Sequence, residues 1–155
     1  MSFKITFLGT SGAQPTKERN VSGLVIEYKD KKFLFDCGEG TQRQLKHTGI
    51  APTRITHLFL THLHGDHCIG LAGFMRNLAM NEFKETLPIY GPKGVRGFVT
   101  TMATCTADKR QIKYKVNVVK NGVIYEDKEI CIRAQHILHT TVCYAYRVQE
   151  KPKRK

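Results

Sequence analysis

A run of apolar residues leads directly into a dense group of polar side chains in the stretch HLFLTHLHGDH, residues 57–67. The apolar part predicts a buried strand, and the polar part begins where that strand ends. Side chains two positions apart in an extended segment point to the same side, so His62 and His64 can bind one ion. This spacing predicts a metal site at the end of a strand.

The second half of the same stretch predicts a second metal position. Gly65 is expected to allow a tight turn that a residue with a Cβ would resist. Beyond that turn, Asp66 and His67 can face another ion. Imidazole and carboxylate ligands together suit zinc and related divalent metals. The competing interpretation is a polar loop with structural histidines, which the density of the cluster disfavours.

The order of the remaining elements predicts an α/β protein. Strands are expected over residues 3–8, 24–28, 32–36, 55–60, 88–90, 111–119, 122–125, 129–134 and 142–148. Helices are expected over 41–46, capped by Thr41, over 68–80, and after Gly94. The apolar stripe of the helix at 68–80 comprises Ile69, Leu71, Ala72, Met75 and Leu78. Such an order predicts sheets that are covered by helices.

Composition places the chain among globular proteins that have a basic surface. Its 155 residues, of which 41% are hydrophobic and 25% charged, suit one domain. The net charge of +12 favours a polyanionic partner, most simply a nucleic acid, over a merely basic protein. The N-terminus has no signal-like segment and no apolar run approaches membrane-spanning length, so no membrane contact and a cytoplasmic location are expected.

The cysteines predict free thiols. There are five of them and no CxxC pair, which argues against a disulfide scaffold and against a four-cysteine zinc site. Cys68 adjoins His67 and can either touch a metal or pack as a thiol, and packing is the favoured interpretation. The others are expected to be buried.

The motif HxHxDH at residues 62–67 is the signature of the metallo-β-lactamase superfamily, and the chain more narrowly resembles ribonuclease Z, the tRNA 3′-processing endonuclease. The resemblance rests on FLGTSG at 7–12, PTKERN at 15–20, FDCGEGTQRQ at 35–44, THLHGDHCIGL at 61–71, and His139 followed by YRV at 146–148. It covers the chain from Phe3 to Val148. The PxKxRN and DCGEGTQRQ stretches make it far more specific than HxHxDH alone.

The resemblance implies two zinc ions per complete site. His62, His64 and His139 would hold one ion, and Asp66 and His67 would hold the other. Asp66 would also accept a proton from the attacking water. Two ions about 3.5–4 Å apart can activate a bridging water and stabilise displacement at phosphorus.

The same resemblance implies an RNA substrate. Lys17, Arg19 and Asn20 would help to bind it, through phosphates and through the backbone or sugar. Without the resemblance, residues 15–20 would be interpreted as a solvated polar loop. The expected function is a zinc-dependent endoribonuclease that removes the 3′ trailer from precursor tRNA and leaves a 3′-hydroxyl. The alternatives are another metallo-β-lactamase-fold phosphodiesterase, or a catalytically incomplete metal- and RNA-binding fragment.

Other polar residues near the motifs leave alternatives open. Proximity alone does not choose between His136 and His139 as a ligand, and the family spacing selects His139. His57 is expected to be structural rather than bonded to a ligand, and His47 to lie at the surface. Asp36 can orient a ligand or cap local amides.

The chain departs from ribonuclease Z because it stops where that family continues. The family's later segment supplies a bridging Asp, a final His and an arm that grips tRNA. Residues 1–155 are therefore expected to form the N-terminal portion of a single metallo-β-lactamase-like domain, roughly the first half of an αββα sandwich. Such a half would expose an apolar sheet face and an unpaired edge. It can be a truncated piece, one part of a protein with a complementary C-terminal half, or a short homodimer.

Overall fold

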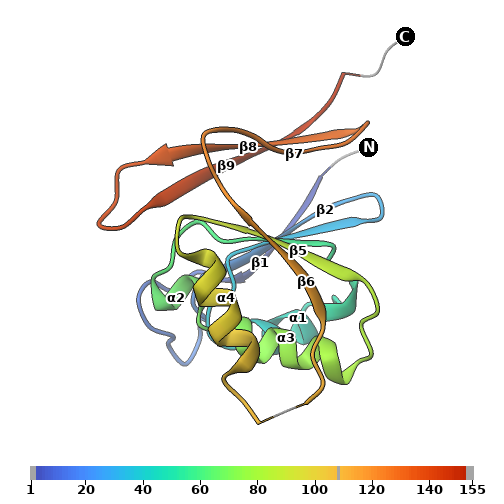
Figure 1. The fold of residues 1–155 in the computed structure, drawn as a ribbon, viewed down its shortest axis with the longest axis vertical. Helices are drawn as coiled ribbons and strands as arrows, with labels where there is room; N and C mark the ends of the chain where they lie inside the picture. The colour runs from blue at the N-terminus through green and yellow to red at the C-terminus, as the bar shows by residue number, and fades with distance from the viewer. Residues whose placement is uncertain (1–2, 108, 153–155) are drawn as a thin grey trace.

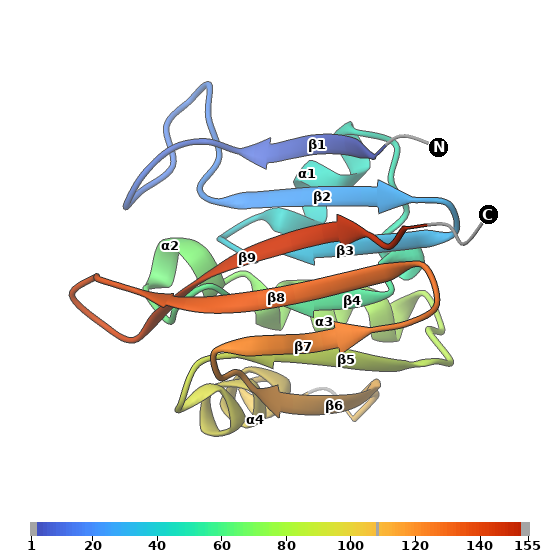
Figure 2. The same ribbon diagram turned by 90° about the horizontal axis from the view of Figure 1, so that it is seen from above.

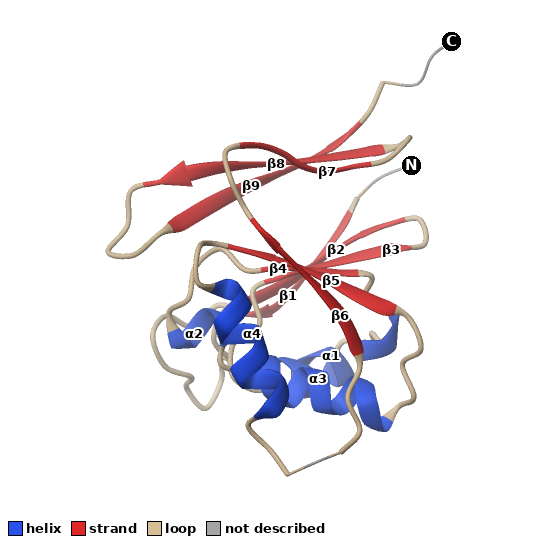
Figure 3. Ribbon diagram, in the orientation of Figure 1, coloured by secondary structure: helices blue, strands red, loops and turns tan. Residues whose placement is uncertain are grey.

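Helices, a large sheet and a small sheet form three layers in the computed structural model, which describes residues 3–107 and 109–152 (Figures 1 and 3). The large sheet has the order β1 (Lys4–Gly9), β2 (Gly23–Tyr28), β3 (Lys31–Phe35), β4 (His57–Phe59), β5 (Thr86–Gly91) and β6 (Lys113–Val118). The first three strands are antiparallel to one another, and β3 to β6 run parallel. The small antiparallel sheet contains β7 (Gly122–Glu126), β8 (Ile130–Ile137) and β9 (Cys143–Glu150).

The helices cover one face of the large sheet, and the small sheet covers part of the other (Figure 3). The helical layer contains α1 (Thr41–His47), a 3₁₀ turn (Pro52–Arg54), α2 (Gly65–Cys68), α3 (Leu71–Met80) and α4 (Val95–Thr104). This arrangement confirms the predicted α/β class and the partial αββα sandwich. None of the helices in the described part of the chain has the length and apolar content needed to span a lipid bilayer.

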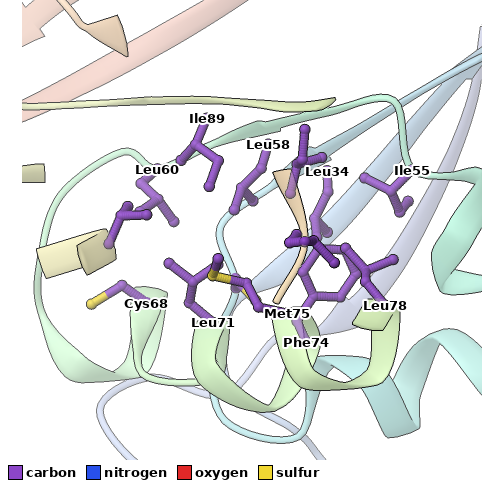
Figure 4. Packing of buried hydrophobic residues seen from close by; sticks show 14 of the residues in the cluster. Leu34, Ile55, Leu58, Leu60, Cys68, Leu71, Phe74, Met75, Leu78 and Ile89 are labelled. Atoms are coloured by element: carbon purple, nitrogen blue, oxygen red, sulfur yellow. The ribbon is translucent and has the colours of Figure 1, made fainter. Parts of the chain in front are cut away.

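Helix α3 packs on the large sheet through one apolar face (Figure 4). Leu71, Phe74, Met75 and Leu78 are buried and recur at the spacing of a helical stripe. The predicted stripe was partly wrong, because Ile69 is 56% exposed and Ala72 is only half-buried. Phe74 is the member of the stripe that the prediction left out.

The single helix predicted over residues 68–80 is divided at Ile69 and Gly70. The Gly70 N–H donates to Cys37 O at 3.0 Å instead of continuing the helical ladder. A Cβ at Gly70 would lie 1.9 Å from Gly38 O, so only glycine permits this approach. The division therefore follows from a contact with a distant turn.

Aromatic residues fill the space between the two sheets. Phe59 is fully buried and stacks against Phe35 and Tyr90, with ring centroids 4.9 and 4.7 Å away. Tyr146 of β9 meets the same ring edge-on at 5.6 Å. This cluster, completed by Tyr28, Phe33, Ile130 and Ile132, is the second core of the molecule.

The small sheet leaves strand β1 uncovered, as Figure 2 shows from above. Ile5 and Phe7 are 55% and 66% exposed. Beside them lies a mostly apolar hollow of about 510 Å³ that reaches Tyr146. Within the described residues, no strand pairs with the outer edge of β9. The expected apolar face and unpaired edge are therefore both present.

In addition to the aromatic core, two sets of polar contacts hold the small sheet on the large one. At the end where β2 turns into β3, Lys31 pairs with Asp127 at 3.1 Å and the Tyr28 hydroxyl donates to Glu150 at 2.6 Å. At the opposite end, the Tyr146 hydroxyl donates to Leu60 O at 2.7 Å. We call the first set the distal latch. Since β3 and β4 both point toward the second set, the residues that follow these strands lie there.

Strand boundaries differ from the prediction where pairing partners extend them. Strands β8 and β9 pair over eight positions each, past the predicted ends at residues 134 and 148. Strand β5 runs over Thr86–Gly91 because each of its residues has a partner on β6. Strand β4 is shorter than the predicted 55–60, because the Ile55 N–H closes the preceding 3₁₀ turn on Pro52 O at 3.1 Å and pairing with β3 begins only at His57.

Candidate metal centre

Three histidines meet at the end of β4. His62 and His64 lie in the extended segment after that strand, and His139 comes from the loop between β8 and β9. Their ligand atoms all lie within 4.8 Å of one another, and His64 Nδ1 is 3.3 Å from His139 Nε2. Zinc–nitrogen bonds of about 2.0–2.1 Å in a tetrahedron place two nitrogens about 3.3–3.4 Å apart. The His64–His139 separation matches this spacing, and the three histidines together could hold one metal ion.

The ring of His62 is held in an orientation suitable for a ligand. Its Nδ1 lies 2.8 Å from the Thr61 hydroxyl, which leaves Nε2 for another partner. Burial first, and then the nearby His67, lower the pKa of His62 to about 4. The ring is therefore neutral at pH 7, the form that binds a metal.

Asp66 and His67 form a separate pair in the first turn of α2. The Asp66 Oδ2 and His67 Nε2 atoms are 3.5 Å apart. The other ring nitrogen, His67 Nδ1, lies 2.6 Å from Asp36 Oδ2. Burial alone would lower the pKa of His67, but the hydrogen bond and charge of Asp36 outweigh it and raise the pKa. Because Nδ1 contacts Asp36, Nε2 is the ring nitrogen that can face an ion beside Asp66, and binding a metal there would displace its proton.

Asp36 fills both roles that the sequence left open. It accepts a hydrogen bond from the Thr61 N–H at 2.8 Å, and it contacts the ring of the predicted ligand His67. A carboxylate behind a ligating histidine fixes the orientation of the ring. Asp36 also has a φ of 57°, in the left-handed region that is unfavourable for a residue with a Cβ. Such backbone conformations persist where the surroundings enforce them, often at functional sites.

The turn at residues 36–40 joins α2, the helix that carries Asp66 and His67, to the rest of the fold. Its Cys37 N–H donates to His67 O at 2.7 Å, and its Gly38 N–H donates to Ser22 O at 3.0 Å. A Cβ on Gly38 would lie 2.4 Å from Asp66 O. The DCGEG segment, residues 36–40, therefore allows the backbones of distant segments to approach one another. Local sequence patterns did not indicate this role.

Two predictions about local geometry were wrong. Gly65 has no positive φ, and a Cβ there would meet nothing within 4 Å, so the turn does not require glycine. The extended His64 leads directly into α2 instead. Thr41 is the first residue of α1 rather than its cap, and its hydroxyl donates to Gly38 O at 2.7 Å. Gly40, with a φ of 73°, occupies the cap position.

The other histidines lie outside the ligand cluster. His57 packs between the sheets, with its ring 4.6 Å from that of Tyr125, and burial lowers its pKa to about 4. His136 contacts the Tyr144 ring at 5.7 Å and is not in the three-histidine group. His47 is exposed at the end of α1, as expected.

The thiols differ partly from the prediction. All five cysteines are free, but Cys105 is exposed and Cys131 is only half-buried. Cys68 packs as a thiol, with its Sγ donating to His64 O at 3.1 Å. Burial raises the pKa of Cys68 to about 12, so its thiol is protonated at neutral pH.

The loop at residues 10–20 reaches Asp66, one of the predicted ligands. Its Ala13 N–H donates to Asp66 Oδ2 at 2.9 Å. Lys17 and Arg19 are exposed, whereas Asn20 is half-buried and donates from Nδ2 to Glu39 O at 2.7 Å. The loop thus carries two exposed cations and is joined through Ala13 to Asp66, which lines a hollow of about 430 Å³ together with the three histidines.

Comparisons with known proteins agree with this geometry. Residues 3–151 match the family described as Anti-Pycsar protein Apyc1. The chain is 40% identical over 153 residues to ribonuclease Z of Geobacillus kaustophilus, covering 96% of this chain and 49% of that protein. It is 40% identical to ribonuclease Z of Methanococcus aeolicus, covering 97% and 48%. The chain thus spans about half the length of these relatives, their N-terminal half.

Solved structures show the same fold. The short form of human tRNase Z (ELAC1) is 30% identical, with a TM-score of 0.86 over 94% of this chain and 64% of that one. The metallo-β-lactamase fold protein YhfI from Bacillus subtilis is 22% identical, with a TM-score of 0.78 over 95% and 58%. The chain therefore has the metallo-β-lactamase fold in part.

Proposed function

Since the chain belongs to the family described as Anti-Pycsar protein Apyc1, with part of a metallo-β-lactamase fold, we propose that it is the N-terminal portion of a metal-dependent endoribonuclease. The proposed reaction removes the 3′ trailer from precursor tRNA in the cytoplasm. The observation that carries the proposal is the convergence of three histidines, the Asp66–His67 pair and the loop bearing Lys17 and Arg19. Similarity to ribonucleases Z supports the choice of substrate.

Zinc is the proposed metal, with two ions in the complete site. His62, His64 and His139 would hold one ion, and Asp66 with His67 would contribute to the other. Bound zinc supplies Lewis acidity at the phosphoryl oxygens and lowers the pKa of water. Two protein ligands make an incomplete zinc site. A complementary C-terminal half, or a second copy of the chain, is proposed to complete it.

Asp66 is the proposed proton acceptor. Water attacks phosphorus, its proton passes to the Asp66 carboxylate, and the bond from phosphorus to O3′ breaks. The departing O3′ takes up a proton and becomes the 3′-hydroxyl of the tRNA, while the trailer keeps the phosphate. Lys17 and Arg19 contact neighbouring phosphates, in keeping with the net charge of +12.

The direct test is cleavage of 3′-extended tRNA by the zinc-loaded protein, with and without a chelator. We expect one cut at the start of the trailer that the chelator abolishes. Cleavage that is indifferent to the chelator would contradict the proposal.

Replacing His139 with alanine is expected to abolish stabilisation by zinc. A ligand present at 100 times its Kd stabilises the folded state by about 2.7 kcal/mol, and His139 supplies one of the three clustered nitrogens. The measurement is the unfolding temperature with and without zinc. His136→Ala, three residues away and outside the cluster, is the matched control. If His136→Ala loses the zinc effect and His139→Ala keeps it, the ligand assignment is wrong.

Replacing both Lys17 and Arg19 with glutamine is expected to weaken RNA binding and its salt dependence. Each lost phosphate contact lowers the slope of log K against log salt by about 0.7–0.9. Titrations at several salt concentrations measure this slope, which should fall by roughly twice that amount. Lys46→Gln with Lys84→Gln, both exposed, removes the same charge elsewhere. Equal losses in both double variants would show a general charge effect instead of contacts.

A second candidate is another phosphodiesterase of the same fold. The matched family carries a description that does not name a ribonuclease, which favours this alternative. Hydrolysis of a small phosphodiester by the protein, with precursor tRNA left uncut, would favour this candidate.

The third candidate is an incomplete metal- and RNA-binding fragment. One zinc ion or none per chain would support it, and two tightly bound ions would contradict it.

A further inference from the structure

The loop at residues 10–20 is built as a self-contained unit. At its base, the Ser11 N–H donates to Asn20 O at 2.9 Å. Within it, the Thr16 N–H donates to Arg19 O at 2.8 Å, and the Thr16 hydroxyl accepts from the Arg19 N–H at 2.9 Å. Residues 12–19 are all exposed, so packing against the core does not hold them in place. The loop's position therefore depends on its base and on the few bonds that it makes to other segments.

Asn20 fixes the base of this loop to the turn at residues 36–40. Its Nδ2 donates to Glu39 O at 2.7 Å, and its Oδ1 lies 3.4 Å from where a Cβ on Gly40 would be. On the other side, a Cβ on Gly9 would lie 2.5 Å from Asn20 O. Asn20 is thus enclosed between two glycines. The same turn also bonds to the backbone of His67, so it supports both the loop at residues 10–20 and helix α2.

Ala13 carries the loop's contact with the metal ligands. It has a φ of 56°, a left-handed conformation that its Cβ makes unfavourable. In that conformation its N–H donates to Asp66 Oδ2 at 2.9 Å. An unfavourable backbone conformation persists only where the surroundings enforce it. Two bonds inside the loop close a tight turn around Ala13, from the Gln14 N–H to Gly12 O at 2.6 Å and from the Ser11 hydroxyl to Gln14 O at 2.7 Å. The base of the loop then decides where this turn lies relative to Asp66.

We propose that Asn20 is a positioning residue, whose bond to Glu39 holds the Ala13 N–H on the carboxylate of Asp66. The carboxylate is thereby kept in one orientation before metal or RNA arrives. The catalytic meaning of that orientation rests on the proposed function, in which Asp66 binds metal and accepts a proton. The Asn20 side chain then acts through the protein backbone and does not contact RNA.

The test follows the Ala13 amide by NMR and hydrogen exchange in the metal-free protein. Asn20→Ala and Asn20→Asp both lack the Nδ2 donor. In each we expect exchange protection of the Ala13 amide to fall at least tenfold and its proton resonance to move upfield. Lys17→Gln should leave the amide unchanged. Asn81→Ala removes a similar 2.7 Å bond from an asparagine side chain to a backbone oxygen and is the matched control.

Two further measurements separate a positioning role of Asn20 from misfolding and from a direct contact with RNA. Thermal unfolding verifies that each variant is folded, and RNA titration of the metal-free protein compares Asn20→Ala with Lys17→Gln. Lys17→Gln should lower RNA affinity without changing the Ala13 amide, which separates the loss of a contact from displacement of the loop. Unchanged protection of Ala13 in both Asn20 variants would overturn the inference. If protection falls but the wild-type protein neither binds nor cuts RNA, the positioning role stands and the proposed function fails.

Discussion

Asp66→Asn is expected to lower the rate of precursor-tRNA cleavage by about 10²–10⁴-fold, the usual contribution of a positioned general base or acid. The change keeps the size of the side chain and an oxygen that can accept the Ala13 N–H. It removes the negative charge, the proton acceptor and a strong metal ligand together. Single-turnover rates on 3′-extended tRNA at saturating zinc measure the effect.

Asp30→Asn is the matched control for this experiment. Asp30 is exposed in the turn between β2 and β3, at the end of the molecule that carries the distal latch, and it undergoes the same chemical change. We expect its rate to equal that of the unchanged protein. A second readout is the number of zinc ions bound, which Asp66→Asn should reduce. An Asp66→Asn protein with full zinc content and full cleavage rate would exclude Asp66 from both roles.

Phe59→Ala is expected to lower the free energy of unfolding by about 3–5 kcal/mol, the usual cost of emptying a buried aromatic site. The ring is fully buried between Phe35 and Tyr90 and touches Tyr146 of the other sheet. Its loss leaves a cavity where the two sheets meet, and β-strands on both sides limit collapse into it. Urea unfolding followed by circular dichroism measures the change.

Phe7→Ala makes the same substitution on the same sheet at a side chain that is 66% exposed. Its effect is expected to stay within about 0.5 kcal/mol, as for most surface changes. If Phe7→Ala and Phe59→Ala lowered the free energy of unfolding by comparable amounts, the Phe7 ring would be buried in solution. The cover provided by the small sheet would then not explain which of the two rings is buried.

The sequence predicted best where neighbouring residues determine the geometry. Alternation in an extended segment places His62 and His64 on one side, and the structure brings their ligand atoms together. The choice of His139 over His136 was different, because the local pattern fits both. It came from the resemblance to a family, and the structure places His136 against Tyr144 instead.

Contacts between distant segments explain what the sequence did not predict. Gly70 interrupts a helical pattern because its N–H bonds to Cys37, more than thirty positions earlier. The left-handed conformations of Ala13 and Asp36 were not predicted either. The Asp36 carboxylate bonds to Thr61 and His67, which become its neighbours only after folding. Burial of Cys131 and exposure of Ile69 were misjudged for the same reason.

The three clustered histidines come from two different sheets, and this division couples distant parts of the molecule. His62 and His64 follow β4, whereas His139 follows β8, so an ion held by all three also joins the two sheets. Coupling between metal binding and the docking of the two sheets is reciprocal. If a bound metal favours the docked arrangement of the sheets, contacts that favour docking raise the affinity for the metal in turn. The Lys31–Asp127 pair lies at the other end of the strands, yet it favours the same docked arrangement. Remote surface charges can thus tune metal affinity without approaching the ion.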